Sequence, residues 1–81
     1  MTARIQLYTR QQCHLCDDAK DALARVRALA PFELETIDVD TDAKLVELYG
    51  LEVPVVLLDG KKVAKFRVDE TALLRRLQVP A

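Results

Sequence analysis

The feature that most constrains this chain is a pair of cysteines, Cys13 and Cys16, placed at a change of periodicity. They are the only cysteines in 81 residues, and two residues separate them. Before the pair, side-chain character alternates as in a strand, and after it apolar residues recur about every 3.6 residues, as in a helix. The alternating set is Ile5, Leu7 and Thr9, and the helical set is Leu15, Ala19, Ala22, Leu23, Val26, Leu29 and Ala30. The sequence therefore predicts a C-x-x-C pair where a strand passes into a helix.

A sulfur at the start of a helix is in a position that favours reactivity. The first turn leaves backbone N–H groups unpaired and carries the positive end of the helix dipole, and both favour a thiolate over a thiol. Asp17 and Asp18 follow the pair, and their negative charges oppose ionisation of a neighbouring sulfur. We therefore expect thiolate character that is weaker than it would be without these two carboxylates.

Other uses of the cysteine pair fit the sequence less well. A four-ligand zinc site needs two more Cys or His ligands, and His14 is the only histidine, so no metal site is predicted. Attachment of haem c requires a histidine directly after the second cysteine, where Asp17 stands. Two inert cysteines remain an alternative, but they do not explain the spacing. A redox-active dithiol is the favoured interpretation.

Composition and charge limit the class of protein. With 51% hydrophobic residues and few glycines and prolines, residues 1–81 are expected to form one small domain. The charged residues nearly cancel to a formal net charge of −1, so neither nucleic acid nor a membrane surface is an expected partner. The N-terminal stretch holds no apolar run long enough for a signal peptide or a membrane span. These features disfavour a static disulfide in an exported protein and predict a cytoplasmic location.

Periodicity and turn signals divide the chain into seven expected elements. Strands are expected at about 4–9, 32–39, 53–58 and 62–66, and helices at about 15–30, 43–49 and 70–77. A frayed tail is expected at 79–81. The order βαβαββα predicts an α/β domain with a central mixed sheet of four strands and helices on both faces.

Local residues mark several boundaries. Asp59-Gly60 is a strong signal for a hairpin turn between the last two strands. Gly50 is expected to end the second helix in the left-handed conformation, and Asp69 is expected to cap the last helix.

The order of elements and its motifs resemble the thioredoxin fold, and the compact form is similar to glutaredoxin. More closely, the chain resembles the small bacterial glutaredoxin-like proteins whose active site reads C-x-L-C. The resemblance covers nearly the whole chain. The stretches that carry it are Leu7-Tyr8-Thr9-Arg10, Cys13-His14-Leu15-Cys16, Val53-Pro54-Val55 and Leu58-Asp59-Gly60.

This resemblance implies a mechanism and a set of site residues. Cys13 would attack a substrate disulfide as the nucleophile, and Cys16 would resolve the mixed disulfide. It also implies a cis Val53-Pro54 bond, which would expose backbone groups for pairing with an extended peptide or with glutathione. The residues expected to contact substrate are Arg10, His14, Leu15, Val53, Pro54 and Asp69. For Arg10, a solvated loop arginine is the alternative, and for His14, an exposed filler.

The chain also departs from glutaredoxins where glutathione would bind. His14 and Leu15 replace a proline and an aromatic residue, and Phe66-Arg67-Val68 stands where a Gly-Gly pair is usual, leaving only Asp69 as a match. We therefore expect a monomeric dithiol–disulfide oxidoreductase with no tightly bound cofactor. Its expected partners are a protein disulfide or a glutathione mixed disulfide, with glutathione, another thiol or a reductase as donor. The alternative is a non-catalytic module that carries an iron–sulfur cluster or glutathione, or recognises a partner.

Overall fold

The structure, a computed structural model, describes residues 3–78, so the tail predicted at 79–81 lies outside the described residues. Its elements follow the predicted order, with one short 3-10 helix, η1, added before the second α-helix. In chain order they are β1 (Arg4–Thr9), α1 (His14–Leu29), β2 (Glu33–Asp38), η1 (Val39–Thr41), α2 (Ala43–Tyr49), β3 (Val55–Leu58), β4 (Lys61–Lys65) and α3 (Glu70–Gln78).

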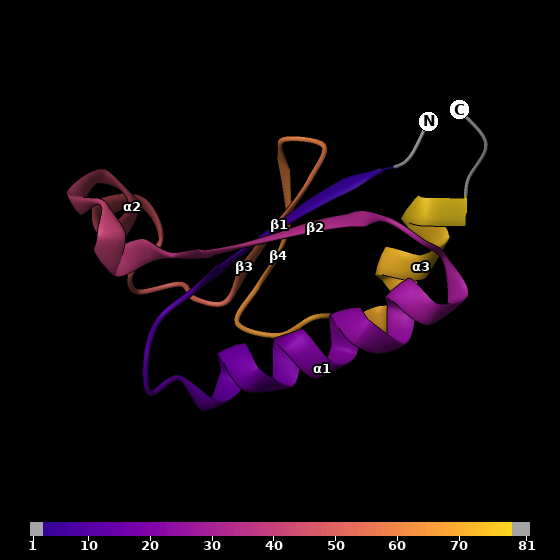
Figure 1. The fold of residues 1–81 in the computed structure, drawn as a ribbon, viewed down its shortest axis with the longest axis horizontal. Coiled ribbons are helices and arrows are strands. Elements are labelled where there is room, and N and C mark those ends of the chain that lie inside the picture. The colour runs from indigo at the N-terminus through magenta and orange to yellow at the C-terminus, as the bar shows by residue number, and fades with distance from the viewer. Residues whose placement is uncertain (1–2, 79–81) are drawn as a thin grey trace.

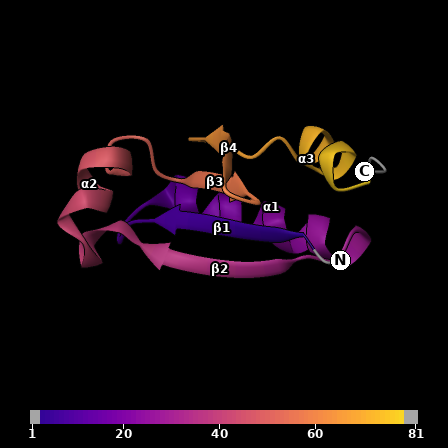
Figure 2. The ribbon, with the colours of Figure 1, turned by 90° about the horizontal axis from the view of Figure 1, so that it is seen from above.

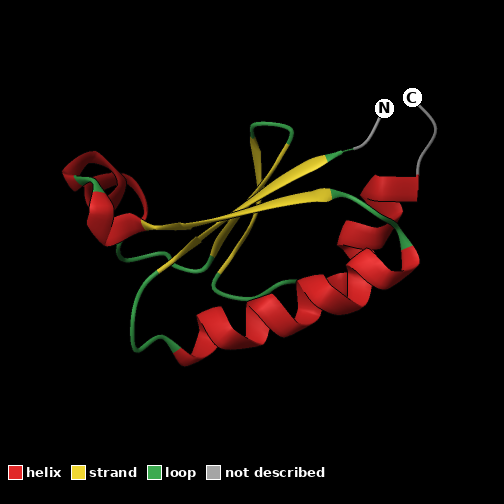
Figure 3. Ribbon diagram, viewed as in Figure 1, coloured by secondary structure: helices red, strands yellow, loops and turns green. Residues whose placement is uncertain are grey.

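The four strands form one mixed sheet in the order β2-β1-β3-β4 (Figure 1). β1 and β2 are parallel because α1 carries the chain back between them, as Figure 3 shows. β3 is antiparallel to β1, and β4 returns antiparallel to β3. The predicted α/β architecture with a four-stranded mixed sheet is therefore confirmed. None of the helices within residues 3–78 has the length and apolar character needed to cross a membrane.

One face of the sheet is closed by α1 and α3. The helical spacing of apolar residues predicted for α1 places a single stripe of that helix against the sheet, and this stripe is buried. Leu23 on this stripe has no exposed surface, and truncating such a side chain to alanine typically costs about 2–5 kcal/mol. The core on this face consists of Ile5, Leu7, Ala19, Leu23, Val26, Phe32, Val56 and Leu73.

The opposite face is covered by α2 only at one end, because α2 lies beyond the ends of the strands in both ribbon views (Figures 1 and 2). Next to α2 the face is apolar, with a buried cluster of Tyr8, Val39, Val55 and Leu57. Farther from α2, Arg4 Nη2 lies 3.0 Å from Oε1 of Glu35. Helices are thus present on both faces, as predicted, and polar side chains take the part of the second face that α2 leaves open.

The turn signals were right in two places and wrong in one. Asp59 and Gly60 have φ values of 49° and 87°, as a two-residue hairpin turn of the expected kind requires. Asp69 caps α3 by accepting a hydrogen bond from the backbone N–H of Ala72 at 3.0 Å. Gly50, however, is right-handed, with φ −55°, and not left-handed as expected.

Two local details differ from the sequence-based expectation, and both bear on the candidate site. A Cβ on Gly50 would lie 2.5 Å from the carbonyl oxygen of Val46, so glycine is needed there for space and not for its left-handed freedom. β4 begins at Lys61 and ends at Lys65, one residue earlier at each end than predicted. Phe66 falls outside the strand and has a positive φ of 66°.

Candidate active site

The two cysteines of the C-x-x-C pair lie at the start of α1 and are joined to each other by a disulfide bond. β1 ends at Thr9, and a short loop brings Cys13, with an extended backbone of φ −113°, to the N-cap position of the helix. Its Sγ accepts a hydrogen bond from the backbone N–H of Cys16 at 3.1 Å. The predicted place of the pair is confirmed, and the sulfur takes the role that a side-chain oxygen usually has in a helix cap.

The two sulfurs differ in their access to solvent. Cys16 is only 1% exposed and belongs to the buried stripe of α1, whereas Cys13 is partly exposed at the open end of the helix. A backbone N–H directed at a sulfur stabilises negative charge on it, so Cys13 is better suited to form an accessible thiolate. Thiol–disulfide exchange is the chemistry that this arrangement can perform.

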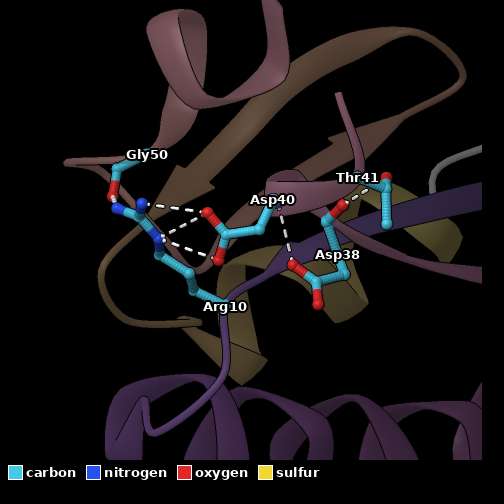
Figure 4. Close-up of polar contacts among 5 residues, drawn as sticks. All are labelled: Arg10, Asp38, Asp40, Thr41 and Gly50. Atoms are coloured by element: carbon cyan, nitrogen blue, oxygen red, sulfur yellow. Dashed lines mark hydrogen bonds and ion pairs between the residues drawn. The ribbon is translucent and has the colours of Figure 1, made fainter. Parts of the chain in front are cut away.

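Arg10, in the loop between β1 and α1, is held by groups on η1 and at the end of α2 (Figure 4). Its Nε lies 3.1 Å from both carboxylate oxygens of Asp40, and its Nη2 lies 2.9 Å from Oδ1. Nη1 donates to the carbonyl oxygen of Gly50 at 3.1 Å. The hydrogen bond to Asp40, with the charge of that carboxylate, raises the pKa of Arg10.

This arrangement corrects the interpretation of Arg10. In Figure 4 the side chain rises away from α1, toward Asp40 and Gly50. The planar guanidinium matches a carboxylate in two parallel contacts, and Asp40 of the same chain already supplies that carboxylate. Arg10 is therefore not a free loop arginine, because its hydrogen bonds tie the loop before the cysteines to η1 and to the end of α2.

Val53 and Pro54 are joined by a cis peptide bond, as the resemblance implied. Pro54 is buried, and its carbonyl oxygen accepts a hydrogen bond from the backbone N–H of Phe66 at 2.9 Å. Within residues 3–78, the backbone N–H and C=O of Val53 have no hydrogen-bond partner. These two groups are the ones that an extended peptide would need for pairing.

The other residues expected to contact substrate are His14, Leu15 and Asp69, and they differ in whether a hydrogen bond within the chain already engages the side chain. His14, the first residue of α1, is exposed, and Leu15 is half-buried. Leu15 lines a cavity of about 170 Å³ together with Phe66 and Val68, from the loop between β4 and α3. The Asp69 carboxylate is engaged as the cap of α3, so its expected role toward a ligand has an internal competitor.

Sequence reasoning missed Phe66 and the two partners of Arg10. Phe66 was expected to be an ordinary strand residue, but it lies at a sharp turn beside the cavity that Leu15 lines. Nothing in a single sequence marks a phenylalanine as having positive φ. The pairing of Arg10 with Asp40 spans 30 residues of sequence, and the acidic segment after β2 was the only available hint of a carboxylate partner.

Comparison with known proteins agrees with this geometry. Residues 4–78 match the model of the Glutaredoxin-like domain (DUF836) family. The chain therefore belongs to the glutaredoxin-like family, and its C-x-x-C pair lies at the expected place in a thioredoxin-like fold.

Individual relatives extend this result. The Uncharacterized protein Mb0520 of Mycobacterium bovis is 36% identical over 75 residues, covering 86% of this chain and 77% of that protein. The X-ray structure of protein XcR50 from X. campestris is 37% identical with a TM-score of 0.77, covering 94% of this chain and 99% of that one. A thioredoxin variant from Halobacterium salinarum, 23% identical with a TM-score of 0.68, covers 94% of this chain and 72% of that one and shares the fold.

Proposed function

We propose that this protein is a dithiol–disulfide oxidoreductase that reduces disulfides of protein substrates. The Cys13 thiolate attacks one substrate sulfur, forming a mixed disulfide and releasing the other substrate sulfur as a thiol. Cys16 then attacks the Cys13 sulfur, which re-forms the Cys13–Cys16 disulfide and releases the second substrate thiol. The substrate disulfide gains two electrons and two protons, and a thiol or a reductase returns them to the cysteine pair.

The observation that carries this proposal is the unequal environment of the two sulfurs. Cys13 lies at the open end of α1 with the Cys16 N–H directed at its Sγ, whereas Cys16 is buried. An external disulfide can reach only the outer sulfur, and the inner one is placed to attack within the same helical turn. This asymmetry supports Cys13 as the nucleophile and Cys16 as the resolving thiol.

Several contacts favour a protein disulfide over glutathione. Two residues expected to hold the charged ends of glutathione have partners within the chain, since Arg10 is paired with Asp40 and Asp69 caps α3. Large apolar side chains are instead exposed near the Pro54 segment. Leu51, three residues before Pro54, is 91% exposed, and Phe66, which donates its N–H to Pro54, is 43% exposed. Exposed apolar surface of this kind fits a protein chain better than a small charged peptide.

The proposal extends to the setting of the reaction. The protein would act as a monomer in the cytoplasm, where thiol donors keep most cysteines reduced and a C-x-x-C pair can cycle. It would need no tightly bound cofactor, because both electrons pass through the two sulfurs. Glutathione remains a weak alternative donor.

Replacement of each cysteine tests the assigned order of attack. Cys13→Ser should abolish reduction of both insulin and hydroxyethyl disulfide. Cys16→Ser should accumulate a mixed disulfide on Cys13, detected by mass spectrometry, because the resolving thiol is gone. Leu29→Ala, at the far end of α1, is the matched control and should keep full activity. Accumulation of the mixed disulfide in Cys13→Ser instead would reverse the two roles.

A second assay tests the choice of donor. In a coupled assay with glutathione and glutathione reductase, turnover should be much slower than with a strong dithiol, and Arg10→Ala should change it little. Efficient turnover at low millimolar glutathione that Arg10→Ala abolishes would restore glutathione as the natural donor. A brown protein obtained under anaerobic purification would favour the iron–sulfur carrier.

A further inference from the structure

Two lysines of β4 reach the same face of the sheet because the strand contains a bulge. Lys62 and Lys65 are three residues apart, so in a regular strand their side chains would point to opposite faces. Lys65 lies opposite Val55 of β3. Lys62 lies opposite Leu57, after a shift of one residue in the register. The shift leaves Val63 as an extra residue, and both lysines therefore lie on the face of the sheet that α2 covers at one end.

These two lysines share one carboxylate, that of Glu52 in the loop between α2 and β3. Lys62 Nζ donates to Oε1 of Glu52, and Lys65 Nζ lies 3.8 Å from Oε2. Lys62 Nζ also lies 6.0 Å from the centroid of the Tyr49 ring, at a cation–π distance. The hydrogen bond from Lys62, with the charges of both lysines, lowers the pKa of Glu52. Glu52 is thus held as a carboxylate by two residues of β4.

The backbone of Glu52 is fixed as well. Its N–H donates to the carbonyl oxygen of Tyr49 at 2.8 Å, and its own carbonyl oxygen accepts from the N–H of Phe66 at 3.3 Å. Glu52 directly precedes Val53, whose backbone N–H and C=O have no partner within residues 3–78. The side chain and both backbone groups of Glu52 are therefore anchored, next to a residue whose backbone groups are open.

The ion pairs of Glu52 do not explain this arrangement through stability. The Glu52 side chain is 30% exposed, and those of Lys62 and Lys65 are 43% and 53% exposed. Ion pairs with this much solvent contact typically contribute little to the stability of a fold. A bulge, in contrast, redirects particular side chains and is frequent next to active sites. The place of the two lysines is therefore explained better by the segment that they hold.

We propose that Glu52 is a positioning residue that, held by Lys62 and Lys65, keeps the Val53 backbone in the orientation that an extended peptide substrate needs. Glu52 does not itself contact the substrate, and it acts by limiting the conformations of the peptide groups around Val53. The inference rests on the proposed function, because it assigns a role in binding a protein disulfide. A substrate that forms no backbone hydrogen bonds with Val53 gains nothing from this preorganisation.

An exchange equilibrium measures this effect without catalytic turnover. In the Cys16→Ser background, Cys13 holds a peptide as a mixed disulfide, and a second peptide thiol displaces it. One S–S bond breaks and one forms, the proton passes from the incoming to the leaving thiol, and there is no net oxidation. The competitors are acetylated and amidated Ala-Ala-Cys-Ala-Ala and the same peptide with methylated peptide nitrogens, which cannot donate backbone hydrogen bonds. Mass spectrometry of an equimolar mixture should show about ten-fold more of the unmethylated peptide bound, as expected from one or two hydrogen bonds.

Removing the charge of Glu52 should reduce this preference. Glu52→Gln keeps the shape of the side chain and should lower the ratio about five-fold, because the peptide itself must then order the Val53 segment. Lys62→Met should lower the ratio about two- to five-fold, and the exchanged pair Glu52→Lys with Lys62→Glu should give a higher ratio than either single variant. Lys61→Met is the matched control and should keep the ratio, since Lys61 lies opposite Leu58 on the other face and forms no ion pair within residues 3–78.

The positioning role fails if the ratio does not depend on Glu52 in particular. Equal binding of the two peptides before Glu52 is changed, a ratio that Glu52→Gln leaves unaltered, or an equal fall in Lys61→Met would each overturn it. A fall in the ratio that only follows a loss of the folded state in urea denaturation would also overturn it. Failure of the unaltered protein to reduce disulfides would overturn the proposed function alone, since exchange on Cys13 can still be measured.

Discussion

Two flanks of the Cys13–Cys16 disulfide differ: toward α2, the polar flank is closed by the hydrogen bonds of Arg10, whereas along α1, the flank that carries Leu15 and Phe66, called here the apolar flank, holds a cavity. On the polar flank, Arg10 joins the Asp40 carboxylate to the carbonyl oxygen of Gly50 through hydrogen bonds within the chain. On the apolar flank, Leu15 and Phe66 line a cavity. A network of charge-assisted hydrogen bonds fixes the geometry of the polar flank, and a cavity lies on the other flank.

The two flanks also differ in how the backbone conformation relates to the type of residue that adopts it. Gly50, on the polar flank, has an ordinary φ of −55° that any residue adopts, yet it has no space for a side chain. Phe66, on the apolar flank, has a φ of 66° that favours glycine, yet it carries a large ring. Glycine thus serves close packing on one side, and on the other side a strained turn presents an aromatic group.

The largest effect should come from adding a methyl group to the polar flank. In Gly50→Ala the new Cβ would meet the Val46 carbonyl oxygen at 2.5 Å and Nη1 of Arg10 at 3.3 Å. Overpacking costs about 1–3 kcal/mol, and the better helix propensity of alanine returns up to about 1 kcal/mol. We expect a net loss of about 1–2 kcal/mol in the free energy of unfolding, measured by urea denaturation.

The same measurement in the Arg10→Ala background separates the contact of that methyl group with Val46 from its contact with Arg10. Because the nearest atom is a backbone carbonyl, Gly50→Ala should be almost as destabilising there as in the unaltered chain. A Gly50→Ala protein as stable as the original would show that the polar flank is loosely packed, and the contrast between the flanks would fail.

The next substitution is on the apolar flank, and we expect it to relieve backbone strain. Phe66→Gly removes a backbone cost of order 1–3 kcal/mol, and the greater freedom of glycine in the unfolded chain takes back about 0.4–1 kcal/mol. We therefore expect Phe66→Gly to be more stable than Phe66→Ala, which loses the same ring, by about 1 kcal/mol in urea denaturation. Phe66→Ala is the matched control, since it keeps a Cβ at positive φ and should gain nothing. A glycine variant less stable than the alanine one would mean that the turn is not strained.

The parts of the molecule that could be predicted from sequence are those that local patterns determine. The strand-to-helix junction at Cys13, the hairpin turn at Asp59 and Gly60, and the cap at Asp69 each depend on residues within a few positions of one another. The order of elements then restricts the sheet to few topologies, so the fold could be predicted as well.

The details of the candidate site could not be predicted because they depend on long-range contacts. Arg10 was expected near Cys13 from its position in the chain, but its partner Asp40 comes from the segment after β2. Gly50 looked like a left-handed helix end, and only the positions of Val46 and Arg10 reveal why a side chain is excluded. The turn at Phe66 depends on its N–H bonding to Pro54, and a single sequence gives no sign of that contact.

The smallest effect concerns an exposed ion pair, Arg25 with Glu70, whose two residues line the cavity on the apolar flank. The hydrogen bond from Arg25, with its charge, holds the pKa of Glu70 below its ordinary value. Because the folded pKa is lower than the unfolded one, near 4.3, the pair contributes stability above that pH and loses it as the pH falls through the folded pKa. Glu70→Gln should therefore be slightly less stable at pH 7, and the gap should close in acid. Urea midpoints of both proteins between pH 7 and pH 3 measure this, and 1 M salt should shrink the gap at neutral pH by screening. A gap that stays constant below pH 4 would mean that Glu70 acts through its shape and not through its charge.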